Sequence, residues 1–325
     1  MKRLNCEISI GDNLFKWCRN VTISSSRENF TDTATIEMPN RFKNRETGEL
    51  GYITTKIKIN DPVTIKLGYF PNLETRFVGY VSNIAPNSPM VVTCEDASFL
   101  LKQSTVGSYS ASDTTISALI GDLYDGETDI TDAEIGDIRI DQYATLVNVL
   151  DDLKSRFGIR SYFQNGVLTI FKEVSDAGND INLGFQKNII EHSLEYQNSD
   201  ALDVISHGVS IQDDGTKIER FAFYFNDEIR VRSEKPEGVL NTFSWPGLTR
   251  DALDELISKR LPKLYYTGIK GSLTTFGEPI INHGDNVILE DLDYREREGK
   301  YKVVSVETSF GENGYRQVVE LDVKI

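Results

Sequence analysis

The chain has 325 residues, of which 39% are hydrophobic and 26% charged, and its formal net charge is −15. This length allows two or three domains, and the composition is that of a globular rather than a disordered protein. The acidic balance argues against tight binding of nucleic acid through phosphate neutralisation. No stretch approaches the ~20 apolar residues of a membrane helix, and no signal peptide is recognisable, so we expect synthesis and assembly in the cytoplasm without membrane insertion.

The first 96 residues predict a β domain. Several short segments alternate apolar and polar residues, with turn residues between them, as strands of a half-buried sheet do. Strands in this number favour a barrel or a sandwich. The predicted strands cover residues 7–10, 21–24, 33–38, 63–67, 76–81 and 90–94.

A polar stretch over residues 41–55 interrupts these strands and predicts a long exposed loop. Loops of this length in compact domains often serve a function. Three basic residues lie close together in it, and they could contact an acidic neighbour. Arg41, Lys43, Arg45 and Glu46 are therefore the candidate partner-interface residues.

Residues 97–190 predict a small α/β domain. Asp96 and Asp113 are each placed to cap a helix, and the apolar residues that follow recur at helical spacing. A third helix is expected to begin after Thr145 and to stop at Gly158. A hairpin with an Asn-Gly turn is predicted over residues 159–171.

Residues 191–325 return to strand patterns. A hairpin is predicted from the alternating runs 204–211 and 218–225, and one helix is predicted over 249–261. Regular alternation continues over 315–325 and predicts a strand tied into a sheet. The sequence thus predicts a mainly β protein in three parts. The parts are a first tube-like β-barrel over 1–96, a small α/β domain over 97–190, and a second tube-like barrel over 191–325 with one inserted helix.

A weak internal repeat relates the two β-rich parts. Residues 60–65 resemble residues 284–289, and the strand that contains Phe77 falls opposite the one that contains Tyr301 at the same offset, since 285 − 61 = 224 and 301 − 77 = 224. Few residues are identical, and any two antiparallel meanders share this rhythm, so coincidence is a real alternative. The repeat hypothesis states that one barrel plan occurs twice.

The sequence contains no recognisable catalytic motif. There is no phosphate-binding loop or nucleophile elbow, and the three histidines make no metal-binding pair. A calcium loop at residues 290–293 is much less favoured than a solvated turn, and Trp245 and the Tyr265–Tyr266 pair are more readily core than sugar-binding residues. Three cysteines in no known motif favour buried thiols. We expect no catalytic site, no cofactor and no metal.

A family resemblance appears in three stretches of the sequence. Residues 63–69, 77–81 and 92–102 resemble the late control protein D family of phages. That family includes baseplate hubs of contractile tails and the hub half of valine–glycine-repeat spike proteins in type VI secretion. The helix after Thr145 looks like the family's small middle domain, and residues 284–316 are similar to its last barrel.

The resemblance implies a structural hub that is not an enzyme. Family hubs are homotrimers in which two tube-like barrels per chain complete a ring of six. This ring would join a sixfold tail tube to a threefold spike, here a separate protein, among other baseplate subunits at the virion tail or injection-machine tip. Two alternatives remain: a β-rich protein that binds or degrades cell wall, and a distal adaptor of a non-contractile tail.

Overall fold

The structure, a computed structural model, divides the chain into two compact units. One unit comprises residues up to 193 together with 272–323, and the other comprises 194–271. The described residues are 3–43, 47–164, 166–171, 178–197, 203–212, 215–226, 228–244, 248–264 and 268–324.

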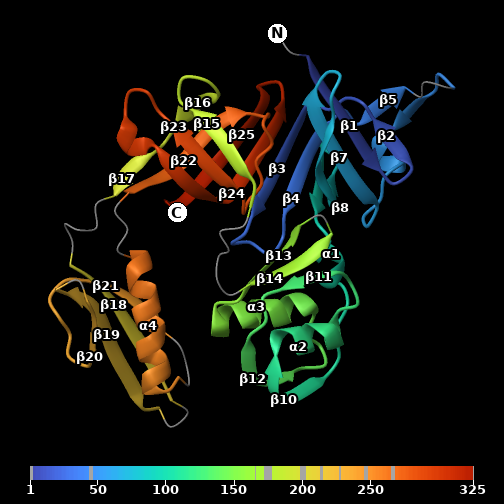
Figure 1. The fold of residues 1–325 in the computed structure, drawn as a ribbon. Coiled ribbons are helices and arrows are strands. Elements are labelled where there is room, and N and C mark those ends of the chain that lie inside the picture. The colour runs from blue at the N-terminus through green and yellow to red at the C-terminus, as the bar shows by residue number, and fades with distance from the viewer. Residues whose placement is uncertain are drawn as a thin grey trace. The chain divides into compact units, whose positions relative to one another are not determined.

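A 14-stranded sheet made from both ends of the chain dominates the first unit (Figure 1). The N-terminal strands are β1 (Leu4–Ile10), β2 (Asn13–Phe15), β3 (Asn20–Ser26), β4 (Thr33–Met38), β7 (Pro62–Tyr69), β8 (Glu74–Ala85) and β9 (Met90–Glu95). The C-terminal strands are β15 (Asp180–Gly184), β16 (Ile189–His192), β22 (Gly268–Phe276), β23 (Asn286–Glu290), β24 (Gly299–Gly311) and β25 (Gly314–Lys324). The fourteenth strand is β17 (Glu195–Gln197), which pairs with the start of β22.

The two ends of the chain pair their strands in the same order. The N-terminal half follows β3-β4-β9-β8-β7-β1, and the C-terminal half follows β16-β22-β25-β24-β23-β15. One difference lies at the end of the series, because β1 pairs antiparallel with β7 whereas β15 pairs parallel with β23. Equal pairing order is what the repeat hypothesis requires, and superposition of the two halves stays a prediction.

A seam between β3 and β24 joins the two halves into one sheet. The strands are antiparallel, with Val306 opposite Ser25 and Phe310 opposite Val21. Figure 1 shows these blue and orange-red strands side by side. The apolar core of the N-terminal half continues across the seam, since Phe310 and Tyr315 belong to it. Burial of apolar area on both sides of the seam therefore stabilises the join.

The mainly β class with an α/β insertion is confirmed, whereas the two barrels are not. The sheet is open, with β16 at one end of the strand order and β2 at the other. Among the described strands, no pairing closes either half into a barrel. The three-part division at residues 96 and 190 stays a prediction. It did not include the separate unit over 194–271.

The α/β part of the first unit packs three helices against short strands. Its core is separate from that of the large sheet and contains the apolar faces of α2 and α3. The elements are α1 (Ser98–Leu101), β10 (Tyr109–Thr115), α2 (Ile116–Leu123), β11 (Thr128–Ile130), β12 (Glu134–Ile140), α3 (Leu146–Phe157), β13 (Arg160–Gln164) and β14 (Val167–Phe171).

Helix ends in this part test the sequence predictions directly. The predicted start of α3 is confirmed, because Thr145 and Asn148 form a reciprocal capping box and Gly158 ends the helix in the left-handed conformation. Asp113 as the cap of α2 was wrong. Thr115 accepts the hydrogen bond from the Ala118 N–H, because the strand β10 extends two residues beyond Asp113 before the chain turns.

The second unit is a four-stranded sheet with one helix. The helix presents Leu253 and Ile257 to the strand that contains Gly208, where an added Cβ would lie 2.6 Å from the Ile257 side chain. This close approach explains a glycine in mid-strand. The elements are β17 (Glu195–Gln197), β18 (Val204–Ile211), β19 (Lys217–Phe225), β20 (Glu228–Arg232), β21 (Val239–Ser244) and α4 (Arg250–Leu264), and β17 pairs with the start of β22.

The polar stretch over residues 41–55 is not one long loop. It contains a short hairpin, β5 (Arg41–Lys43) with β6 (Leu50–Tyr52), followed by a 3₁₀ turn over Ile53–Thr55. Phe42 packs against the N-terminal core and Ile53 is buried, so two apolar anchors hold an otherwise polar segment. The prediction failed because these anchors are too widely spaced to show alternation.

Candidate functional site

A groove lies between the β1–β2 hairpin and the β5–β6 hairpin. Its cavity measures about 660 Å³. Among the residues that the structure describes, four basic side chains line it, Lys16, Arg41, Lys43 and Lys56, against one acidic side chain, Asp12. In a chain with a net charge of −15, this local excess of positive charge attracts acidic partners. We call this surface the basic groove.

Exposed apolar side chains accompany these charges. Leu14 and Trp17 line the groove and are 52% and 62% exposed, and Leu50 and Tyr52 on β6 are also exposed. The guanidinium of Arg41 lies 5.4 Å from the centre of the Tyr52 ring, a cation–π contact. Exposed Trp, Tyr and Arg together are the composition of protein-binding hot spots.

Two of the four sequence-predicted interface residues thus lie on the basic groove. Arg41 and Lys43 are on β5, while Arg45 and Glu46 lie outside the described residues. Sequence reasoning missed Leu14 and Trp17, which lie about 25 residues upstream and are brought to β5 by the folding of the sheet. The available signal was a tryptophan beside a lysine between the predicted strands 7–10 and 21–24.

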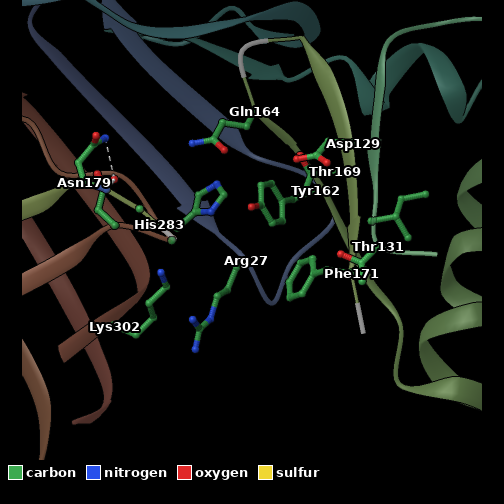
Figure 2. A pocket seen from close by; sticks show the side chains of 14 residues that line it. Arg27, Asp129, Thr131, Tyr162, Gln164, Thr169, Phe171, Asn179, His283 and Lys302 are labelled. Carbon is green, nitrogen blue, oxygen red and sulfur yellow. Dashed lines mark hydrogen bonds between the residues drawn. The ribbon is translucent and has the colours of Figure 1, made fainter. Parts of the chain in front are cut away.

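A second cavity, of about 570 Å³, lies where the α/β part meets both halves of the sheet (Figure 2). Arg27 enters it from the end of β3, Tyr162 from β13, His283 from the segment before β23, and Lys302 from β24. All four belong to the first compact unit. We call this cavity the junction pocket.

Two cations are almost completely buried at the junction pocket. Arg27 and Lys302 are each 3% exposed. The Nη2 of Arg27 donates to the Asp322 carboxylate, and the Nζ of Lys302 donates to Asn286 Oδ1 at 3.1 Å. Buried Arg and Lys are rare unless they are paired, so the pocket is built around charge.

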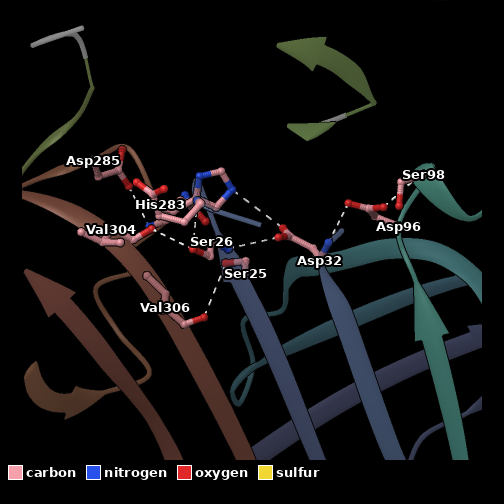
Figure 3. Close-up of polar contacts among 11 residues, drawn as sticks. Ser25, Ser26, Asp32, Asp96, Ser98, His283, Asp285, Val304 and Val306 are labelled. Atoms are coloured by element: carbon pink, nitrogen blue, oxygen red, sulfur yellow. Dashed lines mark hydrogen bonds and ion pairs between the residues drawn. The ribbon is translucent and has the colours of Figure 1, made fainter. Parts of the chain in front are cut away.

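A carboxyl network fastens the sheet behind the junction pocket (Figure 3). The Asp32 N–H donates to Asp96 Oδ2 at 2.9 Å, and the Asp96 N–H donates to the Asp32 carbonyl at 3.0 Å. Asp32 Oδ1 accepts from the Ser26 N–H, and Asp96 Oδ1 accepts from the Ser98 N–H. The network thereby ties the β3–β4 turn to the start of α1.

Burial perturbs the titration of this network. Desolvation, with the charge of Asp96, raises the pKa of Asp32 to about 8, and desolvation lowers the pKa of His283 to about 4. His283 Nε2 lies 3.8 Å from Asp32 Oδ2. At neutral pH the contact therefore joins two uncharged groups rather than an ion pair. Perturbed groups of this kind mark catalytic sites, but each described contact of Asp32 holds chain segments together.

The described residues show no metal-binding geometry either. Among the described residues, no three His, Cys, Asp or Glu side chains gather as ligands would. The acidic run at 290–293 forms a turn in which the Asp291 carboxylate accepts from the N–H groups of Asp293 and Tyr294. In that same described part, none of the helices has the length and apolar character needed to span a membrane.

Comparison with family models found no match, and comparison with curated proteins found none either. Solved structures do match. The 43 kDa tail protein of prophage MuSo2 from Shewanella oneidensis aligns with a TM-score of 0.65 and 14% identity, over 98% of this chain and 97% of that one. A tail protein from Neisseria meningitidis MC58 aligns with a TM-score of 0.65 and 10% identity, over 98% and 96%.

A third match comes from a secretion machine. The E. coli c3393 protein is described as a type VI secretion component with structural similarity to the T4 tail proteins gp27 and gp5. It aligns with a TM-score of 0.57 and 10% identity over 99% of this chain and 77% of that one. Identities this low establish the fold alone. The chain therefore has the fold of phage tail proteins and type VI secretion relatives, as its resemblance to baseplate hubs predicted.

Proposed function

We propose that this chain is a structural hub of a phage tail or related contractile injection machine, and that it catalyses no reaction. The fold shared with tail proteins supports the proposal. The observation that carries it is the equal pairing order of six strands in each half of the sheet, joined at the β3–β24 seam. A chain with two similar β halves suits a junction between a sixfold and a threefold assembly.

Symmetry gives this arrangement its purpose. Three chains would present six β halves, which match a sixfold tail tube on one side, while the threefold trimer matches a spike on the other. The two halves would each act as one barrel-like segment of the ring once neighbouring chains cover their open edges. Tail tube, separate spike and other baseplate subunits are the partners that this role requires.

The negative net charge of the chain suits a ring through which a genome passes. A trimer would carry a formal charge of 3 × −15 = −45. An acidic wall repels phosphate, so a genome that passes through the ring would not adhere to it. DNA binding at low salt is therefore expected to be undetectable.

The basic groove is proposed as a contact to an acidic neighbour, foremost the tail tube. Arg41, Lys43 and Lys16 supply the charge, and Trp17 with Leu14 supplies apolar area that would be buried in the contact. The segment 42–53 is short, most of its described residues are exposed, and Phe42 and Ile53 anchor it. It can therefore adapt to a partner without disturbing the core.

The first expected result is a homotrimer. Light scattering on the purified protein should give three times the 36.6 kDa mass of one chain. If assembly requires a partner, the trimer should form on co-expression with the tube and the spike. A chain that stays monomeric alone and with both partners would contradict the proposed hub.

The second expected result concerns the basic groove. The double variant Arg41→Glu, Lys43→Glu should fold normally, because both side chains are exposed, and should lose co-purification with the tube. The matched control is the double variant Arg139→Glu, Arg295→Glu, which reverses two exposed charges outside the groove. Equal assembly by both double variants would show that the groove is not the tube contact.

A further inference from the structure

Two of the three cysteines of the chain lie next to each other in the N-terminal half of the sheet. The Sγ of Cys6, on β1, lies 3.9 Å from the Sγ of Cys18, and the two thiols share a hydrogen bond. Their exposed fractions are 7% and 6%, and both side chains belong to the apolar core of this half. The sulfur atoms of a disulfide lie about 2.0 Å apart, so a modest approach of the two side chains would allow a bond.

The pairing of β1 with β2 brings these cysteines together. In this hairpin (Figure 1), Ile8 lies opposite Phe15. Followed outward along both strands, the same register puts Cys18 one residue beyond the position opposite Cys6. The Cys6 sulfur also accepts a hydrogen bond from the backbone N–H of Cys18, so it lies beside the Cys18 main chain as well as its thiol. Rotation about the Cα–Cβ bonds can therefore shorten the sulfur–sulfur distance while the strands stay in place.

Hydrogen bonding makes the two thiols unequal acids. The Cys18 thiol and the Cys18 backbone N–H both donate to Cys6 and lower its pKa, although burial opposes them. The hydrogen bond with Cys6, together with burial, raises the pKa of Cys18. Cys6 is therefore the thiol that ionises first, and the thiolate is the form that attacks oxidants.

Cys94, the third cysteine, has different surroundings. It is fully buried on β9, and its neighbours across the sheet are Ala34 on β4 and Val81 on β8. Burial raises the pKa of the Cys94 thiol to about 12. Cys94 is therefore expected to remain a reduced thiol under conditions that oxidise the other two, and it serves as an internal control.

We propose that Cys6 and Cys18 form a redox modification site, at which a hydroperoxide converts the two thiols into a disulfide. The Cys6 sulfur attacks a peroxide oxygen, the O–O bond breaks, and the departing hydroxide takes up the proton that Cys6 releases. The Cys18 sulfur then attacks the sulfenic acid on Cys6, the S–O bond breaks, and a second water leaves with the Cys18 proton. Two thiols thus lose two electrons to one molecule of hydrogen peroxide, which becomes two molecules of water.

The disulfide would close a short loop that contains one wall of the basic groove. The loop over residues 6–18 includes the groove residues Leu14 and Trp17, and Trp17 directly precedes Cys18. A covalent link across the loop restricts the unfolded chain and so stabilises the folded one. Cytoplasmic reductants keep thiols reduced, so the link is expected where oxidants prevail.

Mass spectrometry of the full chain before and after treatment with hydrogen peroxide tests the proposal. The treated protein is quenched with catalase, unfolded and alkylated with iodoacetamide. We expect one alkyl group on the treated chain, at Cys94, and three on the untreated chain. Trypsin cleaves after Lys16 and Arg19, so the disulfide should appear as peptides 4–16 and 17–19 joined together, and dithiothreitol should separate them. The oxidised chain should show a Tm higher by roughly 5 °C or more.

Single substitutions test the order of the two steps. Cys6→Ser should keep both of its remaining thiols after treatment with peroxide. Cys18→Ser should stop at the sulfenic acid on Cys6, which dimedone traps. The matched control Cys94→Ala should form the same disulfide as the wild-type chain, since it leaves the pair intact.

Three alkylated cysteines in the treated wild-type chain would overturn the proposal. A disulfide that includes Cys94, or one that joins two chains, would overturn it as well. If a variant does not fold, the joined peptides from the wild-type chain still decide the question. None of these results depends on whether the chain forms a trimer or contacts a tail tube, so the proposed hub and the redox site can fail separately.

Discussion

Replacing Gly79 by alanine is expected to destabilise the first unit severely, by more than about 3 kcal/mol. An added Cβ at this position on β8 would lie 2.1 Å from the Glu95 carbonyl oxygen and 2.8 Å from a ring carbon of Phe77. Glu95 belongs to β9, which is fixed between β4 and β8 in the sheet. Neither backbone can move away without breaking the pairing on its other side.

A matched glycine on the same chain provides the control. Gly121 lies on the exposed face of α2, and an added Cβ there meets nothing within 4 Å. Gly121→Ala should stabilise the protein by about 0.5–1 kcal/mol, because alanine favours the helix. Denaturant unfolding followed by circular dichroism compares the two. Similar small shifts in both variants would show that the approach of β8 to β9 is looser than described.

The second large effect is a dependence of stability on pH that Asp32 creates. Its pKa is about 8 in the folded chain and near 3.8 when unfolded, so between these values the folded state binds more protons and stability falls as pH rises. His283 acts oppositely between about 4 and 6.5, because its pKa is lowered by folding. Above pH 6.5 only Asp32 of these two groups still changes its protonation on unfolding. Between pH 6.5 and 8 this should lower the free energy of unfolding by about 2 kcal/mol.

Asp32→Asn isolates this effect. Asparagine cannot ionise and keeps an oxygen for the Ser26 N–H. The difference in unfolding free energy between variant and wild type should therefore shift in favour of the variant from pH 6.5 to 8, measured by denaturant unfolding at several pH values. Asp151→Asn, at an exposed position on α3, should show no such shift. A pH-independent difference for Asp32→Asn would mean that this carboxyl ionises normally.

Local sequence patterns predicted local structure well. Thr145 and Gly158 specify the ends of α3 because capping acts over three or four residues. The hairpins β13–β14 and β18–β19 follow from alternation and turn residues. The cap of α2 was misplaced because Asp113 and Thr115 are both capable of capping, and the end of β10 decides between them.

Features formed by segments far apart in the chain could not be predicted from the sequence. The β3–β24 seam pairs strands that have no local signal for each other, and its register comes from the packing of Phe310 and Tyr315 with the N-terminal core. For the same reason Arg41 and Lys43 were identified as a basic cluster, while Trp17 was not joined to them. The junction pocket could not be predicted either, since Arg27 and Lys302 meet only after both halves fold.

The seam also has a consequence for synthesis. Ser25 contacts the carbonyl of Val306, 281 residues further along the chain, so β3 waits roughly 15 to 55 s for its partner at 5–20 residues per second on the ribosome. Throughout that time β3 presents an open strand edge, which is a template for pairing with other nascent chains. High contact order of this kind slows folding. Chains that stall before residues 299–311 should therefore aggregate, and chaperones that shield strand edges should raise the yield of the whole protein.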